Sequence, residues 1–151
     1  ERGNVLETGG GICKALPLLK SEYFLVINGD VWTDFDLSTL SPCGDSLAHL
    51  VLVNNPPHHP DGDFGLDHGK VMEKTPGRPA WTYSGTGVFS HKLFEACPAG
   101  RFPLAPLLRQ HMAGKRVSGE LYKGTWHDVG TVERLQQLDR QLSAGLARRP
   151  E

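Results

Sequence analysis

Two aspartates follow stretches with the composition of β-strands, and this placement suggests a bound cation. Asp30 comes just after the apolar run 23–27, and Asp128 ends the stretch 117–128. In open α/β sheets, ligands bind just past the carboxyl ends of the strands. Mg²⁺ is commonly held by one or two carboxylates together with substrate phosphates. We therefore predict that Asp30 and Asp128 supply half of a site for Mg²⁺ and a phosphorylated ligand.

A run of glycines near the start of the chain is a second candidate for ligand contact. We predict that 8–11 turns between a short strand at 4–7 and a helix that begins at Ile12. Glycines let backbone N–H groups approach a ligand closely, and a helix N-terminus favours phosphate. The run matches neither common phosphate-loop pattern, so the residues alone favour a simple tight turn.

Two polar clusters have ordinary structural explanations. Asp34 and Asp36 form the DxD pattern that metal-dependent glycosyltransferases use, but Asp36 is well placed to cap a short helix at 37–40. His58 and His59 lie on a proline-rich loop with no other His or Cys at ligand spacing. We expect that loop to be solvated.

The composition is that of one ordinary globular domain, which we expect to span 1–151. Of 151 residues, 38% are hydrophobic and 22% are charged, and the net charge of -1 provides no field for nucleic acid or an anionic membrane. The chain has no apolar run of membrane-spanning length and no signal pattern, so we expect a cytoplasmic location. Its three cysteines form no CxxC pair and are predicted to be reduced and packed: Cys13, Cys43 and Cys97.

The remaining pattern predicts alternating strands and helices. The uninterrupted apolar run before Asn28 favours a parallel strand covered on both faces. Glycines at 85 and 87 within a strand indicate close approach by a ligand or another backbone. We predict strands at 46–53, 81–89 and 117–126, a hairpin at 64–74 turning at His68-Gly69, and helices at 91–97 and 103–113. A last helix follows Thr131, with a predicted core stripe of Val132, Leu135, Leu138, Leu142 and Leu146.

Five motifs, taken in order, resemble those of the sugar-1-phosphate nucleotidyltransferases. The resemblance spans nearly the whole chain and implies a Rossmann-like, glycosyltransferase-A-like fold with a mixed, mostly parallel sheet flanked by helices. The family's first strand and its triphosphate loop, Gly-x-Gly-Thr-Arg-x-x-Pro, do not precede Glu1. We therefore expect an N-terminally truncated chain that is poorly active alone. The motifs lie at 6–12, 26–34, 62–66, 84–88 and 126–131.

The resemblance assigns roles to particular positions. It implies that Asp30 and Asp128 are the catalytic Mg²⁺ ligands. For Glu73 and Lys74 a solvated pair is equally compatible, because Thr75 replaces the proline found in many relatives. The resemblance places Glu7, Thr8, Gly9, Gly10, Asn28 and Gly29 around the nucleotide, and Gly65, Glu73, Lys74, Ser84, Gly85, Thr86 and Gly87 around the sugar phosphate.

The implied activity is nucleotidyl transfer from UTP to a sugar 1-phosphate, with release of pyrophosphate. The implied sugar is N-acetylmuramic acid 1-phosphate, in cell-wall sugar recycling, and the protein is expected to be a monomer or small homo-oligomer. The alternatives are guanylyl transfer to mannose 1-phosphate and uridylyl or thymidylyl transfer to glucose 1-phosphate. A non-catalytic sugar-nucleotide sensor and an inactive fragment with an exposed sheet edge also remain open.

Overall fold

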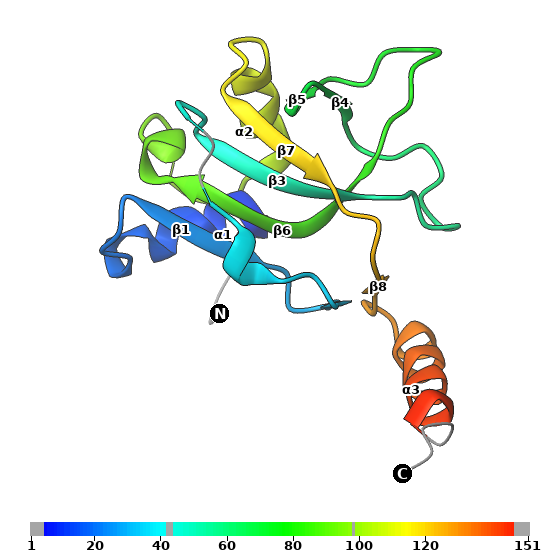
Figure 1. The fold of residues 1–151 in the computed structure, drawn as a ribbon. Coiled ribbons are helices and arrows are strands. Elements are labelled where there is room, and N and C mark those ends of the chain that lie inside the picture. The colour runs from blue at the N-terminus through cyan, green and yellow to red at the C-terminus, as the bar shows by residue number, and fades with distance from the viewer. Residues whose placement is uncertain (1–4, 42–43, 98, 147–151) are drawn as a thin grey trace.

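A six-stranded mixed sheet forms the body of the molecule (Figure 1), seen in a computed structural model that describes residues 5–41, 44–97 and 99–146. The strand order is β1-β6-β3-β7-β5-β4, and β2 and β8 form a separate two-stranded sheet. The strands are β1 (Tyr23–Ile27), β2 (Val31–Thr33), β3 (Ala48–Val53), β4 (Gly65–Asp67), β5 (Lys70–Met72), β6 (Thr82–Ser90), β7 (Val117–Leu121) and β8 (Trp126–Asp128). The α-helices are α1 (Glu7–Ala15), α2 (Leu104–Met112) and α3 (Val132–Leu146).

The core lies between the sheet and helix α2. Strand β3 is central, and from Leu50 to Val53 every residue is buried, as expected for a strand covered on both faces. Helix α2 presents its apolar positions to this strand and its neighbours, because residues three and four apart share one helix face. These are Leu104, Leu107, Leu108 and Met112, and all four are buried. Figure 1 shows α1 and α2 on the same side of the sheet.

The sheet is mixed as predicted, but the prediction that most of its strand pairs are parallel is wrong. Only the pair β3 and β7 is parallel among the described strands, whereas β1 and β6, β3 and β6, β4 and β5, and β5 and β7 are antiparallel. The predicted single strand at 117–126 is instead two strands, β7 and β8, and β7 lies inside the large sheet between β3 and β5. The α/β class itself is confirmed.

Strand β1 is not the doubly covered parallel strand that its apolar run predicted. It lies at the edge of the sheet, antiparallel to β6, and the side chains of Leu25 and Ile27 are 43% and 44% exposed. A continuous apolar run indicates a strand, but it does not specify which strands lie beside it or whether they are parallel.

The predicted strand and glycine turn at 4–11 are also wrong, because helix α1 begins at Glu7 and contains all three glycines. The absence of side chains allows α1 to approach the segment 100–102. A Cβ on Gly10 would lie 2.1 Å from the Gly100 carbonyl oxygen, and one on Gly9 would lie 2.4 Å from the Phe102 ring. The Gly10 amide donates to the Phe102 carbonyl at 3.1 Å. Tertiary packing therefore outweighs the poor helix propensity of glycine.

Helix α3 does not bury the apolar stripe that its spacing predicted. Leu138 is 5% exposed, but Val132, Leu135 and Leu142 are 64%, 53% and 40% exposed. Figure 1 shows α3 extending away from the six-stranded sheet, which leaves most of this stripe without a neighbour among the described residues. The side chain of Leu146 lies outside the described part.

Several local predictions are confirmed. The hairpin of β4 and β5 turns at His68 and Gly69, whose φ angles of 46° and 75° are those of a tight hairpin turn. Asp36 caps the 3₁₀ helix Leu37–Thr39 as predicted. The helix predicted at 91–97 is a shorter 3₁₀ helix, His91–Phe94, whose N-cap is Ser90. The free cysteines Cys13 and Cys97 pack against the core, while Cys43 lies outside the described residues. Within the described ranges, no helix has the length and apolar character needed to cross a membrane.

Candidate active site

The small sheet of β2 and β8 brings Asp30 and Asp128 together. Val31 of β2 lies opposite Asp128 of β8, and the Val129 amide donates to the Asp30 carbonyl at 2.8 Å. Both carboxylates also border Gly130. A Cβ on that glycine would lie 2.9 Å from Asp30 Oδ2 and 3.1 Å from Asp128 Oδ1. The two predicted metal ligands thus share one small region, although they are far apart in sequence.

Cationic and neutral donors already surround the Asp128 carboxylate. Its Oδ1 accepts a hydrogen bond from the Gly130 amide at 2.8 Å. Its Oδ2 lies 3.0 Å from an Arg134 guanidinium nitrogen and 3.1 Å from His58 Nε2. His58 is therefore a site residue that the sequence interpretation missed, because nothing in its loop indicates a contact with a carboxylate 70 positions away. Its partner Arg134 comes from the first turn of α3.

Asp34 of the DxD pattern and His59, the second histidine of the proline-rich loop, have structural roles. Asp34 Oδ1 accepts hydrogen bonds from the Tyr122 hydroxyl and, at 2.7 Å, from the Thr125 amide. The Tyr122 hydrogen bond is the main reason that the pKa of Asp34 is lowered. These bonds tie the end of β2 to the segment before β8. His59 Nε2 lies 3.0 Å from Asp63 Oδ1.

A cavity of about 300 Å³ surrounds the two aspartates. The described residues contain no group of three or more His, Cys, Asp or Glu side chains that could hold a metal ion by themselves. Two carboxylates nevertheless fit Mg²⁺, because this ion prefers oxygen ligands and usually keeps waters or substrate phosphates in its remaining positions. The lining residues include Asn28, Asp30, His58, His59, Asp63, Tyr83, Ser84, Gly85, Trp126 and Asp128.

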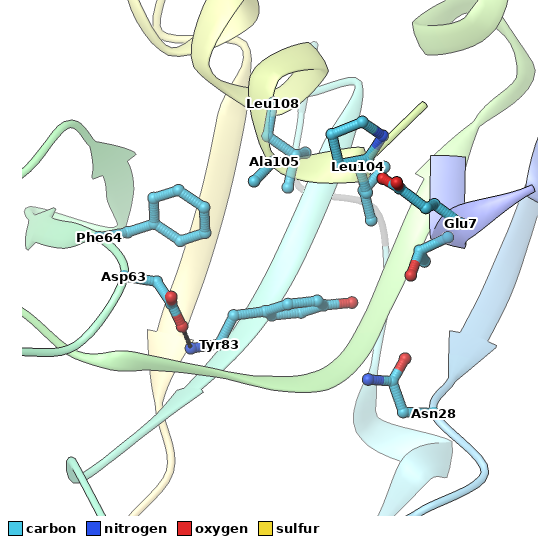
Figure 2. A pocket seen from close by; sticks show the side chains of 10 residues that line it. Glu7, Asn28, Asp63, Phe64, Tyr83, Leu104, Ala105 and Leu108 are labelled. Atoms are coloured by element: carbon cyan, nitrogen blue, oxygen red, sulfur yellow. Dashed lines mark hydrogen bonds between the residues drawn. The ribbon is translucent and has the colours of Figure 1, made fainter. Parts of the chain in front are cut away.

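A second cavity, of about 390 Å³, adjoins the first and is lined by α1, α2 and β6 (Figure 2). The two cavities share Asn28, Asp63 and Tyr83. One side of the second cavity is apolar and comes largely from α2, while Glu7, Thr8 and Asn28 supply polar groups. Two connected cavities, one acidic and one partly apolar, can hold a phosphate with its cation beside a larger organic group.

The residues predicted to bind the nucleotide are only partly brought together. Glu7 and Thr8 line the second cavity, and Glu7 Oε1 accepts a hydrogen bond from Arg101 Nε at 2.6 Å. Gly9 and Gly10 are instead buried against 100–102. Asn28 lies against Gly85 (φ 81°), where any side chain would meet Asn28 atoms 2.8 Å away. Gly29 is exposed in the turn before Asp30.

The residues predicted to face the sugar phosphate fall into three places. Ser84 and Gly85 line the aspartate cavity. Thr86 and Gly87 are buried within the sheet. Gly65 and Glu73 line a separate cavity, where Glu73 pairs with Arg109 at 3.2 Å, and Lys74 Nζ donates to the Gly62 carbonyl at 2.9 Å.

Gly130 offers a direct test of how closely the carboxylates must approach. The change Gly130→Ala is expected to weaken Mg²⁺ binding by about tenfold, because the new methyl group pushes aside the two carboxylates that we expect to meet the ion at about 2.1 Å. Folding should change little, since the atoms displaced are the ends of side chains. Isothermal titration with Mg²⁺ measures the effect. In the control Gly114→Ala, the nearest atom is 3.6 Å away, and equal Mg²⁺ affinities in the two variants would contradict the expectation.

The chain is similar to two curated proteins named N-acetylmuramate alpha-1-phosphate uridylyltransferase. It is 48% identical over 139 residues to the protein from Neisseria meningitidis serogroup B, covering 87% of this chain and 60% of the relative. The protein from Caulobacter vibrioides is 31% identical over 145 residues, covering 86% and 59%. No model of a protein family matches the chain.

Solved structures share the fold at lower sequence identity. HddC from Yersinia pseudotuberculosis, complexed with GMP-PN, has a TM-score of 0.66 and 24% identity, covering 93% of this chain and 64% of its own. The inositol-1-phosphate CTP transferase from T. maritima has a TM-score of 0.69 and 12% identity, with 95% and 63% covered. These likenesses confirm the Rossmann-like α/β fold.

The fold, the paired aspartates and the curated relatives agree on one class. The chain belongs to the sugar-1-phosphate nucleotidyltransferase family. Within that family, the relatives named above are N-acetylmuramate 1-phosphate uridylyltransferases, and the chain spans about 60% of their length.

Proposed function

We propose that the protein transfers UMP from UTP to N-acetylmuramic acid 1-phosphate, giving the UDP-sugar and pyrophosphate in cytoplasmic recycling of cell-wall sugars. The observation that carries this proposal is the meeting of Asp30 and Asp128 at Gly130, beside two connected cavities. The choice of UTP and of this sugar is supported by the 48% identity to a protein named for that reaction.

The reaction needs no covalent enzyme intermediate. An already ionised oxygen of the sugar 1-phosphate attacks the α-phosphorus of UTP, and the bond between that phosphorus and pyrophosphate breaks. Because the nucleophile carries no proton to be removed, the protein must mainly position the reactants and stabilise charge. Mg²⁺ held by Asp30 and Asp128 would supply charge neutralisation on the phosphate oxygens.

The residues of this chain hold that region in place. Trp126 of β8 donates from its indole nitrogen to the Ser84 carbonyl of β6 at 3.0 Å, which joins the small sheet to the large one. Arg134 and His58 hold Asp128 from the side of α3 and the proline-rich loop. Arg134 also lies near Gly130, where a guanidinium can attract a phosphate that approaches the carboxylates.

The test is pyrophosphate release by the protein as its gene encodes it. We expect kcat/KM for UTP with N-acetylmuramic acid 1-phosphate to exceed by about 100-fold the values for GTP with mannose 1-phosphate and dTTP with glucose 1-phosphate. A higher value for either competing pair would replace the proposed substrates. No release with any pair, despite sugar-nucleotide binding, would favour a non-catalytic sensor.

A further inference from the structure

The hydroxyl of Tyr83 is a buried polar group without a hydrogen-bond partner among the described residues. Tyr83 lies on β6, and its backbone amide donates to Asp63 Oδ2 at 2.8 Å, which holds the main chain at this position. Burial raises the pKa of the Tyr83 hydroxyl, which therefore stays protonated and can donate. Buried donors are normally paired, and an unpaired one at the edge of a cavity points to a partner that arrives with a ligand.

The surroundings of this hydroxyl limit the ligand chemistry. In Figure 2 the Tyr83 ring lies across the second cavity from the start of α2, and its hydroxyl points to the end where Glu7 and Asn28 lie. The wall across from the ring is formed by Leu104, Ala105 and Leu108. The cavity thus combines one hydrogen-bond donor with an apolar wall.

A neutral acyl group satisfies both parts of this cavity. Its carbonyl oxygen accepts from the hydroxyl, and its methyl group needs no hydrogen bond at the apolar wall. A plain sugar hydroxyl placed at that wall would leave its own donor unpaired. A carboxylate placed at the apolar wall would leave its charge unpaired there.

We propose that Tyr83 determines selectivity for sugar 1-phosphates that carry an N-acyl group, by donating its hydroxyl hydrogen to the acyl carbonyl. This inference rests on the proposed function and names the residue that distinguishes acylated from plain sugars. The two cavities share the lining residues Asn28 and Asp63, so we place a sugar with its phosphate at Asp30 and its substituent toward Tyr83. Asn28 is exposed and lies at the end of the cavity to which the hydroxyl points, so we expect its side chain to move when the acyl carbonyl binds.

Calorimetric titrations of the protein as its gene encodes it test this with N-acetylglucosamine 1-phosphate and glucose 1-phosphate as probes. Tyr83→Phe should weaken binding of the acetylated sugar by about 10- to 100-fold, and binding of glucose 1-phosphate by less than about twofold. The control Tyr23→Phe removes a hydroxyl from β1, outside both cavities, and should change neither affinity. Equal losses for both probes, or no loss for either, would overturn the inference.

A second variant probes the apolar wall independently. Ala105→Leu adds bulk where the acyl methyl group is expected, and should reduce affinity for the acetylated sugar by at least about tenfold more than for glucose 1-phosphate. Uridylyl transfer by the unmodified protein is measured in parallel. If no sugar 1-phosphate accepts UMP, the proposed function fails and this inference fails with it. If acetylated and plain sugars are used equally well, the inference alone fails.

Discussion

Asp30→Asn and Asp128→Asn are each expected to lower Mg²⁺-dependent nucleotidyl transfer by about 1,000-fold in the protein as its gene encodes it. Asparagine keeps the shape of the side chain but removes the negative charge that attracts the cation. Asp30 faces the cavity from the turn after β1, and Asp128 faces it from β8, so loss of either carboxylate leaves the ion with one protein ligand. The rate of pyrophosphate release at saturating Mg²⁺ gives the effect.

Asp61→Asn is the matched control for these two variants. Asp61 is an exposed carboxylate on the loop near His59, and it does not line the aspartate cavity. Its replacement should leave the rate within about twofold of the original, as is usual for exposed polar positions. Near-normal turnover by Asp30→Asn or Asp128→Asn would show that the two carboxylates do not hold the catalytic ion.

Gly10→Ala is expected to destabilise the protein by about 3–5 kcal/mol, whereas Gly11→Ala stabilises it by about 0.5–1 kcal/mol. Both glycines lie in helix α1. A Cβ on Gly10 would meet the Gly100 carbonyl oxygen at 2.1 Å, and this rigid backbone atom cannot yield without separating α1 from the segment 100–102. A Cβ on Gly11 meets nothing within 4 Å, so the better helix propensity of alanine is gained without a clash.

Urea denaturation of the two variants separates packing from propensity. Because the changes are chemically identical and adjacent in one helix, the difference in unfolding free energy reports the local contact. Similar destabilisation by both would indicate that α1 is not packed as described. The comparison also bears on the site, since α1 carries Glu7 and Thr8 to the second cavity.

Local patterns predicted much of the fold because their causes lie within a few residues. The turn at His68 and Gly69, the caps at Asp36 and Ser90, and the buried face of α2 all depend on neighbours in sequence. The predictions were wrong where contacts between residues far apart in sequence determine the structure. Gly9 and Gly10 are helical because they pack on the segment 100–102, and most of the α3 stripe is exposed because no described element covers it.

The site shows the same division. Asp30 and Asp128 were predictable because each follows a strand and stands in a motif that resembles the family. The pairing of His58 with Asp128 and the enclosure of the Tyr83 hydroxyl depend on how separate segments meet in space. Neither contact can be predicted from periodicity or from neighbouring residues in the sequence. The assignment of Gly9 and Gly10 to the nucleotide stays a prediction, and the structure adds that both glycines allow two chain segments to pack closely.

Whether Asp30 and Asp128 hold one cation is tested by a crystal structure of the protein with Mn²⁺ and a UDP-sugar, analysed by anomalous scattering. We predict one strong anomalous peak within about 2.2 Å of carboxylate oxygens from both Asp30 and Asp128, with phosphate oxygens completing the coordination. A peak elsewhere, or phosphates bound away from Gly130, would contradict this prediction.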